Sequence, residues 1–383
     1  MKLVRLILLA VLGFTAAPAA NAVEDGAAKL AIWCEFMPYR DVLKTLPALG
    51  RYHCDLLLHV GRNDIGSPDL SRVYRDAEAE GVEVIAWFLL PYDEHLYVGE
   101  GSVESTRALA LDFADWATRE HLPARQVVFD CEPSPLLGRR LFAEVRRYSL
   151  LGLAQELRSE MDPAAFASSV ESLNGLIDEL HARDLQVMGA ANRVFLDFLD
   201  RGNTTFQDAL NAPFTMIHWD RASFITYRYK APQEGYIAMV NRYATLSRRF
   251  FGERAALDLG LLGDQRGMPE HLERAELFGG GDSFRDYLDG IRSVYDLQDA
   301  VGVALACGVR NINLYSLDGA VGSVAGLERW LRAASESRAA GGLARWTPVR
   351  SATLGAFSGL LNGLFASLVD RPFQRRYSRV PTM

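Results

Sequence analysis

The sequence predicts an α/β fold, a single-domain (β/α)₈ barrel, and three observations lead to it. Short apolar runs alternate along the chain with segments whose apolar residues recur at the helical period of about 3.6 residues. Several of these runs are apolar almost throughout, as expected for parallel strands that are covered on both faces. Eight such units follow one another with no shorter repeat, which favours a closed barrel over an open sheet.

The strands and helices can be placed by residue number. Leu109, Phe113 and Trp116 share one face of a helix that begins near Ser102, and this face should pack against the barrel. The expected strands are residues 30–36, 54–60, 82–90, 126–132, 185–191, 222–229, 256–262 and 311–317.

The segment after the fourth strand is longer than an ordinary crossover. Residues 136–184 predict a long helical stretch, with Asp162-Pro163 as a break between two helices. We therefore expect a helical insertion at this point. A doubly wound open sheet is the alternative fold, but it would need a glycine-rich turn after its first strand, and residues 32–41 (IWCEFMPYRD) contain no glycine.

The two ends of the chain differ from the expected domain, residues 23–346. Residues 1–22 have a basic start, an apolar core and small residues up to Ala22, so we expect a bacterial signal peptide and a secreted or periplasmic protein. Residues 347–383 predict a C-terminal helix and a basic tail. Their uncharged part, residues 351–369, is expected to pack across the barrel, with peripheral contact to a membrane as the alternative.

Composition argues against several classes of function. The 383 residues carry a formal net charge of −7, so no overall positive field attracts nucleic acid. The seven histidines are scattered and no CxxC or HExxH pattern occurs, so we expect neither a metal site nor another cofactor. Each cysteine lies in an apolar run, and we expect buried free thiols at Cys34, Cys54, Cys131 and Cys307.

In a barrel, the reactive groups lie where strands end and loops begin. The residues at these expected strand ends are rich in carboxylates and aromatic rings and poor in lysine and histidine. Such a lining suits sugars, because rings stack on pyranose faces and carboxylates act on glycosidic oxygens. In chain order the candidates are Glu35, His59, Asn63, Trp87 through Asp93, Asp130, Glu132, Asn192, Tyr227, Tyr229, Asp264, Tyr315 and Asp318.

Residues 127–133 (VVFDCEP) contain the most informative pair of carboxyl groups, Asp130 and Glu132. Side chains alternate along a strand, so Asp130 and Glu132 point to one side and Cys131 to the other. Two carboxylates in a low-dielectric site do not both ionise readily, so one keeps its proton to a higher pH than in water. The pair therefore predicts a general acid that works near neutral pH, with a structural pair neutralised by arginines or backbone amides as the alternative.

A glycosidase normally needs a second carboxylate across the sugar. The seventh strand and its exit (ALDLGLLGD, residues 256–264) offer Asp264 beyond the strand and no glutamate. This favours a substrate-assisted route, in which the sugar's 2-acetamido oxygen is the nucleophile, Glu132 protonates the leaving oxygen and Asp130 orients the acetamido group. Glu35 is the reserve candidate for a second protein carboxylate, and Asp93 is another.

These residues resemble those of glycoside hydrolase family 18, the chitinases and endo-β-N-acetylglucosaminidases, which are (β/α)₈ barrels. Residues 129–132 (FDCE) are similar to the end of the family's Asp-x-Glu motif on strand four. Residues 219–228 (WDRASFITYR) are similar to its Trp-Asp and Met-x-Tyr-Asp elements, and residues 315–318 (YSLD) to the Trp-Ser-Leu-Asp context after strand eight. The resemblance implies that Tyr227 binds the acetamido group and that Tyr315 forms the floor of the subsite.

The chain departs from the family pattern at several positions. Val128 and Arg125 occupy the places of the family's two earlier aspartates on strand four. Arg228 replaces the aspartate of strand six, and we expect it to pair with Glu132 or Asp220, with recognition of an acidic sugar as the alternative. A chitin substrate therefore does not follow from the resemblance.

The remaining aromatic residues divide into two groups. Trp33, Trp116 and Trp330 are expected to pack in the core. Trp87 and His59 are equally suited to the site and to the core.

The sequence thus predicts an exported glycoside hydrolase that acts on an N-acetylhexosamine-containing oligo- or polysaccharide. Two alternatives stay open: a barrel that binds glycans without catalysis, and a glycosidase that uses a second protein carboxylate on a sugar without the acetamido group. The expected catalytic residues are Glu132, Asp130 and Tyr227, and the expected substrate-binding residues are Tyr315, Trp87, Glu35, Asp220, Asn192 and Asp318.

Overall fold

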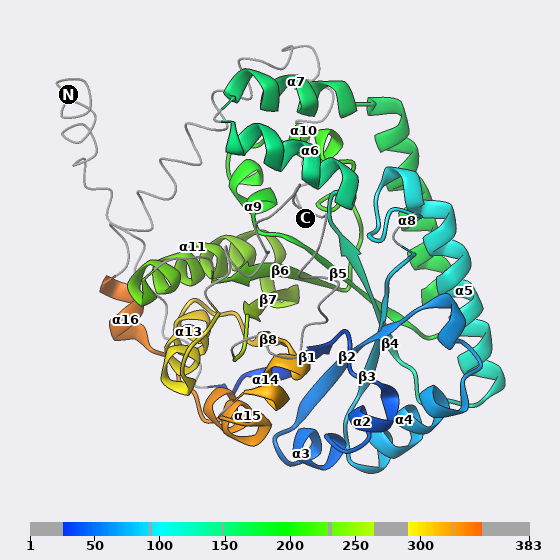
Figure 1. Cartoon of the computed structure of the whole chain (residues 1–383), viewed down its shortest axis with the longest axis vertical. Helices are drawn as coiled ribbons and strands as arrows, with labels where there is room; N and C mark the ends of the chain where they lie inside the picture. The colour runs from blue at the N-terminus through cyan, green and yellow to red at the C-terminus, as the bar shows by residue number, and fades with distance from the viewer. Residues whose placement is uncertain are drawn as a thin grey trace.

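A computed structural model describes residues 26–346, apart from 92–93, 148, 229–231, 264–289 and 324. Its strands pair in parallel and in chain order, and the last pairs with the first, which closes the barrel (Figure 1). The expected (β/α)₈ barrel is therefore confirmed. The strands are β1 (Lys29–Cys34), β2 (Cys54–Val60), β3 (Val84–Phe88), β4 (Gln126–Cys131), β5 (Gln186–Asn192), β6 (Arg221–Tyr227), β7 (Ala255–Gly260) and β8 (Asn311–Tyr315).

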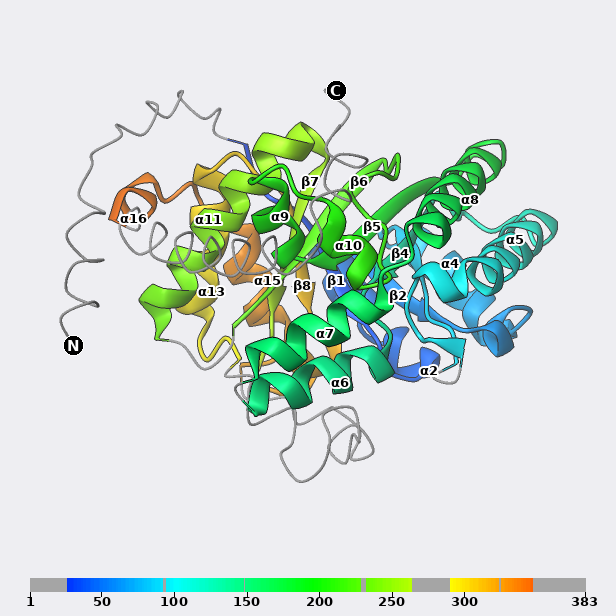
Figure 2. The same ribbon diagram turned by 90° about the horizontal axis from the view of Figure 1, so that it is seen from above.

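Helices surround the barrel and connect its strands (Figures 1 and 2). Among the described residues, none of these helices is long and apolar enough to cross a lipid bilayer. They are α2 (Tyr39–Val42), α3 (Leu46–Arg51), α4 (Pro68–Ala79), α5 (Val103–Arg119), α6 (Pro135–Arg146), α7 (Leu150–Glu160), α8 (Pro163–His181), α9 (Val194–Leu199), α10 (Thr205–Ala209), α11 (Gln233–Phe251), α13 (Val294–Ala306), α14 (Leu317–Gly322), α15 (Leu327–Ser335) and α16 (Gly341–Trp346).

Several expectations fall outside these ranges. The signal peptide, the C-terminal helix and the basic tail lie in residues 1–22 and 347–383, which the structure does not describe. The same holds for Asp93, Tyr229 and Asp264.

The main hydrophobic core lies between the outer face of the barrel and the helices that surround it. Along α5, the side chains of Leu109, Phe113 and Trp116 are buried as expected, and the rings of Phe113 and Trp116 lie 5.8 Å apart. Ser102 occupies the N-cap position of this helix. Burial of such large side chains is the main source of stability for the fold, at about 25 cal/mol per Å² of apolar surface.

The stretch after β4 contains three helices, α6, α7 and α8, and not the two expected. Asp162 does mark a break, because its side chain accepts hydrogen bonds from the amides of Ala164 and Ala165 at the start of α8. A second break precedes α7, where the Ser149 hydroxyl accepts the Gly152 amide. A serine cap without a proline is a weak signal in sequence, which explains why this break was missed.

The side chains that point into the barrel are stacked in layers. Parallel strands that tilt around a barrel place inward residues of alternate strands at the same height. The pairing register gives three successive layers toward the carboxyl-terminal end: Trp33, Trp87, Ala190 and Asp258; then His59, Asp130, Ile225 and Tyr315; then Glu35, Leu89, Asn192 and Gly260. Glu132 and Tyr227 follow at the mouth of the barrel.

Three of the four cysteines and three tryptophans are buried as the sequence predicts, whereas Cys307 is only partly buried. All four cysteines are free, and Cys34, Cys54 and Cys131 are buried. Trp33, Trp116 and Trp330 are buried as well.

Candidate active site

Asp130 and Glu132 lie at the carboxyl-terminal end of β4 and point into the barrel. They occupy alternate positions along the strand, while Cys131 between them is buried in the outer core. Asp130 is the deeper of the two, with 7% of its surface exposed, whereas Glu132 is half-buried. The backbone carbonyl of Asp130 accepts the amide of Val98 (2.8 Å), which fastens the loop after β3 to the end of β4.

The two carboxyl groups are both shifted toward the protonated form. Burial raises the pKa of Asp130 well above its usual value, and the charge of Glu132 adds to the shift. Burial also raises the pKa of Glu132 to about 7, although a hydrogen bond donated by Asn192 and the nearby charge of Arg193 act in the opposite direction. Each charge opposes the ionisation of the other, so the two titrate as a coupled pair.

A third carboxyl group, Glu35, follows β1 on the other side of the barrel mouth. Burial raises the pKa of Glu35 to about 7, and the charges of Asp318 and Glu132 contribute. The hydroxyl of Tyr315 donates a hydrogen bond to Glu35 Oε2, which favours the ionised form and limits the shift. Tyr315 therefore holds Glu35 in position at the end of β8.

Tyr227 and Tyr315 form an aromatic pair at the ends of β6 and β8. Their ring centroids are 5.0 Å apart. Gly260, on β7 between these strands, makes the contact possible, because a Cβ there would lie 2.8 Å from the Tyr315 carbonyl oxygen and 3.0 Å from Tyr227 Cδ1. The charges of Asp130 and Glu132 contribute to the raised pKa of Tyr227, so this ring lies near both carboxyl groups.

Asp258 on β7 belongs to the same group of carboxyl groups, although it is not among the residues expected from the sequence. Its side chain is fully buried beneath the layer of Asp130. Oδ1 accepts hydrogen bonds from Trp33 Nε1 (3.0 Å), Ser223 Oγ (2.7 Å) and Asn313 Nδ2 (2.8 Å). Alternation along β7 puts Asp258 on the same face as Ala256 and Gly260, and this pattern was the available signal.

Comparison with known proteins gives likeness of fold only. No family model and no curated protein matches the sequence. Similar solved structures include the PgaB (BpsB) glycoside hydrolase domain from Bordetella bronchiseptica (12% identity, 76% of this chain and 94% of that one, TM-score 0.42). They also include a chitinase from Chromobacterium violaceum (10%, 81% and 99%, TM-score 0.47) and an HMG-CoA lyase from Brucella melitensis (12%, 86% and 99%, TM-score 0.39). Glycoside hydrolases and other barrel enzymes thus occur among the similar structures, so the likeness does not distinguish between their reactions.

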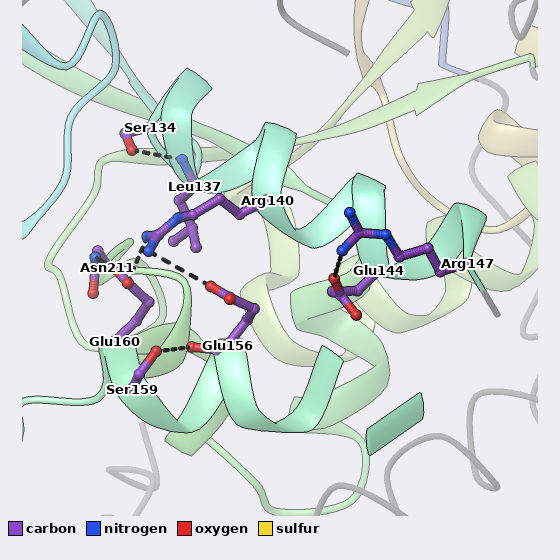
Figure 3. Close-up of polar contacts among 9 residues, drawn as sticks. All are labelled: Ser134, Leu137, Arg140, Glu144, Arg147, Glu156, Ser159, Glu160 and Asn211. Atoms are coloured by element: carbon purple, nitrogen blue, oxygen red, sulfur yellow. Dashed lines mark hydrogen bonds and ion pairs between the residues drawn. The ribbon is translucent and has the colours of Figure 1, made fainter. Parts of the chain in front are cut away.

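The helical insertion stands directly beside the site. The chain runs from Glu132 through a short turn into α6, and α6 packs along α7 (Figures 1 and 2). Arg140 of α6 pairs with Glu156 (3.5 Å) and Glu160 (2.5 Å) of α7, and Glu160 accepts a hydrogen bond from Asn211 Nδ2 (3.1 Å), as Figure 3 shows. Partly exposed ion pairs contribute little to stability, but these join α6 to α7, and Asn211 links α7 to the residues that follow α10.

Two of the expected substrate-binding residues support other parts of the site. The carboxylate of Asp318 accepts the backbone amides of Glu35 (3.2 Å) and Phe36 (3.3 Å), so Asp318 positions the exit of β1. Trp87 lies inside the barrel with 4% of its surface exposed, and its ring packs edge-on against Trp33 at 4.8 Å.

Asp220 and Arg228 lie apart from the carboxyl group cluster, contrary to expectation. Asp220 precedes β6, at the amino-terminal end of the barrel, where it accepts the Val187 amide (2.7 Å) and contacts His181 Nε2 (2.8 Å). Arg228 forms an ion pair with Asp296 (3.4 Å), not the expected pair with Glu132 or Asp220. For Asp220 the reason is its position, because a residue before a strand and one after it face opposite ends of a barrel. For Arg228 the reason is alternation, because Tyr227 points into the barrel and the next side chain points outward, where it meets Asp296 of α13.

Among the described residues, no group of three or more histidine, cysteine, aspartate or glutamate side chains has a geometry that could hold a metal ion. At the barrel mouth Tyr315 donates to Glu35 and Asn192 to Glu132. Deeper in the barrel, Asp258 accepts from Trp33, Ser223 and Asn313. What this arrangement can do chemically is to store and transfer protons.

Proposed function

We propose that this protein is a glycoside hydrolase that acts on an N-acetylhexosamine-containing glycan, with Glu132 as general acid and base. One observation carries the proposal: Glu132 is half-buried at the barrel mouth, beside the more deeply buried Asp130, and its pKa is about 7. Near neutral pH such a carboxyl group is protonated often enough to donate a proton and ionised often enough to take one back.

The proposed reaction has two steps. Glu132 protonates the glycosidic oxygen while the acetamido oxygen of the same sugar attacks C1, so the bond from C1 to the leaving oxygen breaks and a cyclic oxazolinium ion forms. Glu132, now ionised, then takes a proton from water as the water oxygen attacks C1 and the bond to the acetamido oxygen breaks. Asp130 and Tyr227 would hold the acetamido group in place, as the resemblance to family 18 implies.

A second candidate uses two protein carboxyl groups on a sugar that lacks the acetamido group. Glu35 favours it, because its pKa is also about 7 and its charge influences the site from the opposite strand end. In this alternative Glu35 would act as nucleophile or base while Glu132 donates the proton. The hydrogen bond from Tyr315 supports an ionised Glu35 in that role.

The experiment is a hydrolysis assay of the mature protein on glycosides with and without the acetamido group. Glu132→Gln should lower kcat by about 10²- to 10⁴-fold, the range for loss of a general acid and base. A thiazoline analogue of the oxazolinium ion should inhibit the wild type competitively. Glu35→Gln separates the two candidates, because it should abolish turnover only in the two-carboxylate mechanism.

Two results would contradict the proposal. Hydrolysis by Glu132→Gln at the wild-type rate would remove Glu132 from the mechanism. Glycan binding without hydrolysis of any substrate would instead support a barrel that only binds glycans. Asp220→Asn is the matched control, because Asp220 lies at the other end of the barrel.

We further propose that residues 1–22 are removed on export and that residues 351–369 pack on the barrel. Amino-terminal sequencing of protein recovered from the periplasm or the medium tests the first point, with a start at Val23 expected. Sedimentation with anionic vesicles tests the second, since a membrane-bound helix would carry the protein into the pellet.

A further inference from the structure

Two buried carboxylate oxygens inside the barrel have no hydrogen-bond partner within the described part of the chain. They are Oδ1 of Asp130 and Oδ2 of Asp258. A buried ionised oxygen without a partner is costly, because it has lost the hydration that it had in the unfolded chain. Two such oxygens in one interior suggest that each is the partner of the other.

The strand register brings these two side chains together. Asp130 lies one layer nearer the carboxyl-terminal end than Asp258, and both point into the barrel. On the intervening strands, Ala190 pairs with Asp130 on one side and with Ser223 on the other. Both of these side chains are small. The larger inward side chain on these strands is Ile225 of β6, which lies at the height of Asp130.

The donors around Asp258 show which of the two carries the charge. All three hydrogen bonds to Asp258, from Trp33, Ser223 and Asn313, go to Oδ1. Three donors on one oxygen stabilise the ionised form. Asp130 has no comparable set at its Oδ1.

We propose that Asp258 is a positioning residue, which stays ionised and shares one proton with Asp130, held between Asp130 Oδ1 and Asp258 Oδ2. The proton is bonded to Asp130 Oδ1, which donates a hydrogen bond to the ionised Oδ2 of Asp258. No covalent bond forms or breaks. The negative charge of Asp258, one layer deeper in the barrel, thereby keeps Asp130 protonated, so that the Asp130–Glu132 pair carries at most one negative charge. The effect of Asp258 on catalysis rests on the proposed function. The shared proton does not depend on that function.

The electrostatic environment agrees with this assignment. The pKa of Asp130 is raised by burial first, and then by the charges of Glu132, Asp258 and Glu35. The pKa of Asp258 is raised by burial, but its three donors act against the shift. The titratable groups that face Asp130 from the surrounding strands are Glu35 (β1), His59 (β2), Glu132 (β4), Tyr227 (β6), Asp258 (β7) and Tyr315 (β8).

The direct test is carbon-13 NMR of the wild-type protein labelled at its aspartate side-chain carboxyl groups. At pH 7 one buried aspartate should be protonated, and its resonance should disappear in Asp130→Asn. In Asp258→Asn, which keeps the Oδ1 acceptor, Asp130 should titrate at a pH lower by about one unit or more, because a neighbouring negative charge is gone. An ionised Asp130 in the wild type at pH 7, or an unchanged Asp130 titration in Asp258→Asn, would overturn the proposal.

The matched control is Asp55→Asn. Asp55 is also a carboxyl group on a barrel strand, but it lines a cavity of about 270 Å³ at the amino-terminal end and accepts the Glu83 amide (3.1 Å). This substitution should leave the titration of Asp130 unchanged. A shift as large as in Asp258→Asn would show a general effect of charge and overturn the specific pairing.

Enzyme kinetics separate this inference from the proposed function. If Glu132 is the general acid, the basic limb of kcat/KM against pH should move down by about one unit in Asp258→Asn, because the charge of Asp258 raises the pKa of Glu132. A purely structural role of Asp258 would lower the rate without moving this limb. Absence of hydrolysis in the wild type, together with the expected NMR shift, would refute the proposed function and leave the shared proton standing.

Discussion

Replacement of Tyr315 by phenylalanine isolates one hydrogen bond of the site. The Tyr315 hydroxyl donates to Glu35; burial raises the pKa of Glu35 and this bond limits the rise, so that the pKa is about 7. Tyr315→Phe keeps the ring and its contact with Tyr227 but removes the donor. The ionised form of Glu35 loses a stabilising partner, so its pKa should rise.

The size of the shift follows from the strength of the bond. A hydrogen bond to a charged group contributes about 1.5–3 kcal/mol, and one pKa unit corresponds to about 1.4 kcal/mol. The pKa of Glu35 should therefore rise by about one to two units from its value of about 7. At pH 7 the ionised fraction of Glu35 would fall from about one half to below about one tenth.

The measurement is an NMR titration of the glutamate side-chain carboxyl carbons in the two proteins. Glu35→Gln assigns the resonance. Tyr227→Phe is the matched control, because Tyr227 belongs to the same aromatic pair but the Glu35 hydrogen bond comes from Tyr315. The reasoning fails if Glu35 titrates at the same pH in Tyr315→Phe and in the wild type.

Three further predictions concern stability, measured as the free energy of unfolding in urea. Gly260→Ala should lower the free energy of unfolding by about 1–3 kcal/mol, because the new Cβ would lie 2.8 Å from a carbonyl oxygen. Its control is Gly175→Ala in α8, which has open space around it and should be neutral or stabilising. Equal losses of stability in the two variants would contradict this prediction. The pKa values of Glu35 and Glu132 rise on folding from about 4.5 to about 7, so the folded state binds more protons in this range and stability should fall as pH rises through it. Glu132→Gln should reduce that loss, and a wild type equally stable at pH 5 and pH 8 would speak against it. Asp220→Ala should lower stability by about 1 kcal/mol or more, because the buried amide of Val187 loses its acceptor, without changing the affinity for any glycan.

Much of the barrel could be predicted because its pattern is local. Continuous apolar runs and amphipathic stretches lie along the chain itself, and the eight expected strands all overlap the observed ones. The alternation of side chains on β4 likewise places Asp130 and Glu132 on one face without knowledge of any other strand. The order of the strands around the barrel then brings Glu35, Glu132 and Tyr315 to the same end.

The interior of the barrel was harder to predict, because it depends on register. Asp258 lies within β7, whereas site residues were expected only at or beyond the ends of the strands. The partner of Arg228 lies on α13, which follows β7 in the chain and comes close only in the folded barrel. For Asp220 a sequence motif suggested the site, but it lies before its strand and not after it.

The hydrogen bond from Trp33 to Asp258 also links the charge of this buried carboxyl group to tryptophan fluorescence. The indole ring donates its N–H to a carboxylate and packs edge-on against Trp87, so the emission of Trp33 depends on whether that carboxylate is charged. The remaining tryptophans of the described chain lie in the outer core or in helices. Fluorescence of the unlabelled protein, with Trp33→Phe as reference, would therefore report in real time any change in the charge of Asp258 and in the proton that it shares with Asp130, including during the arrival of a ligand at the mouth.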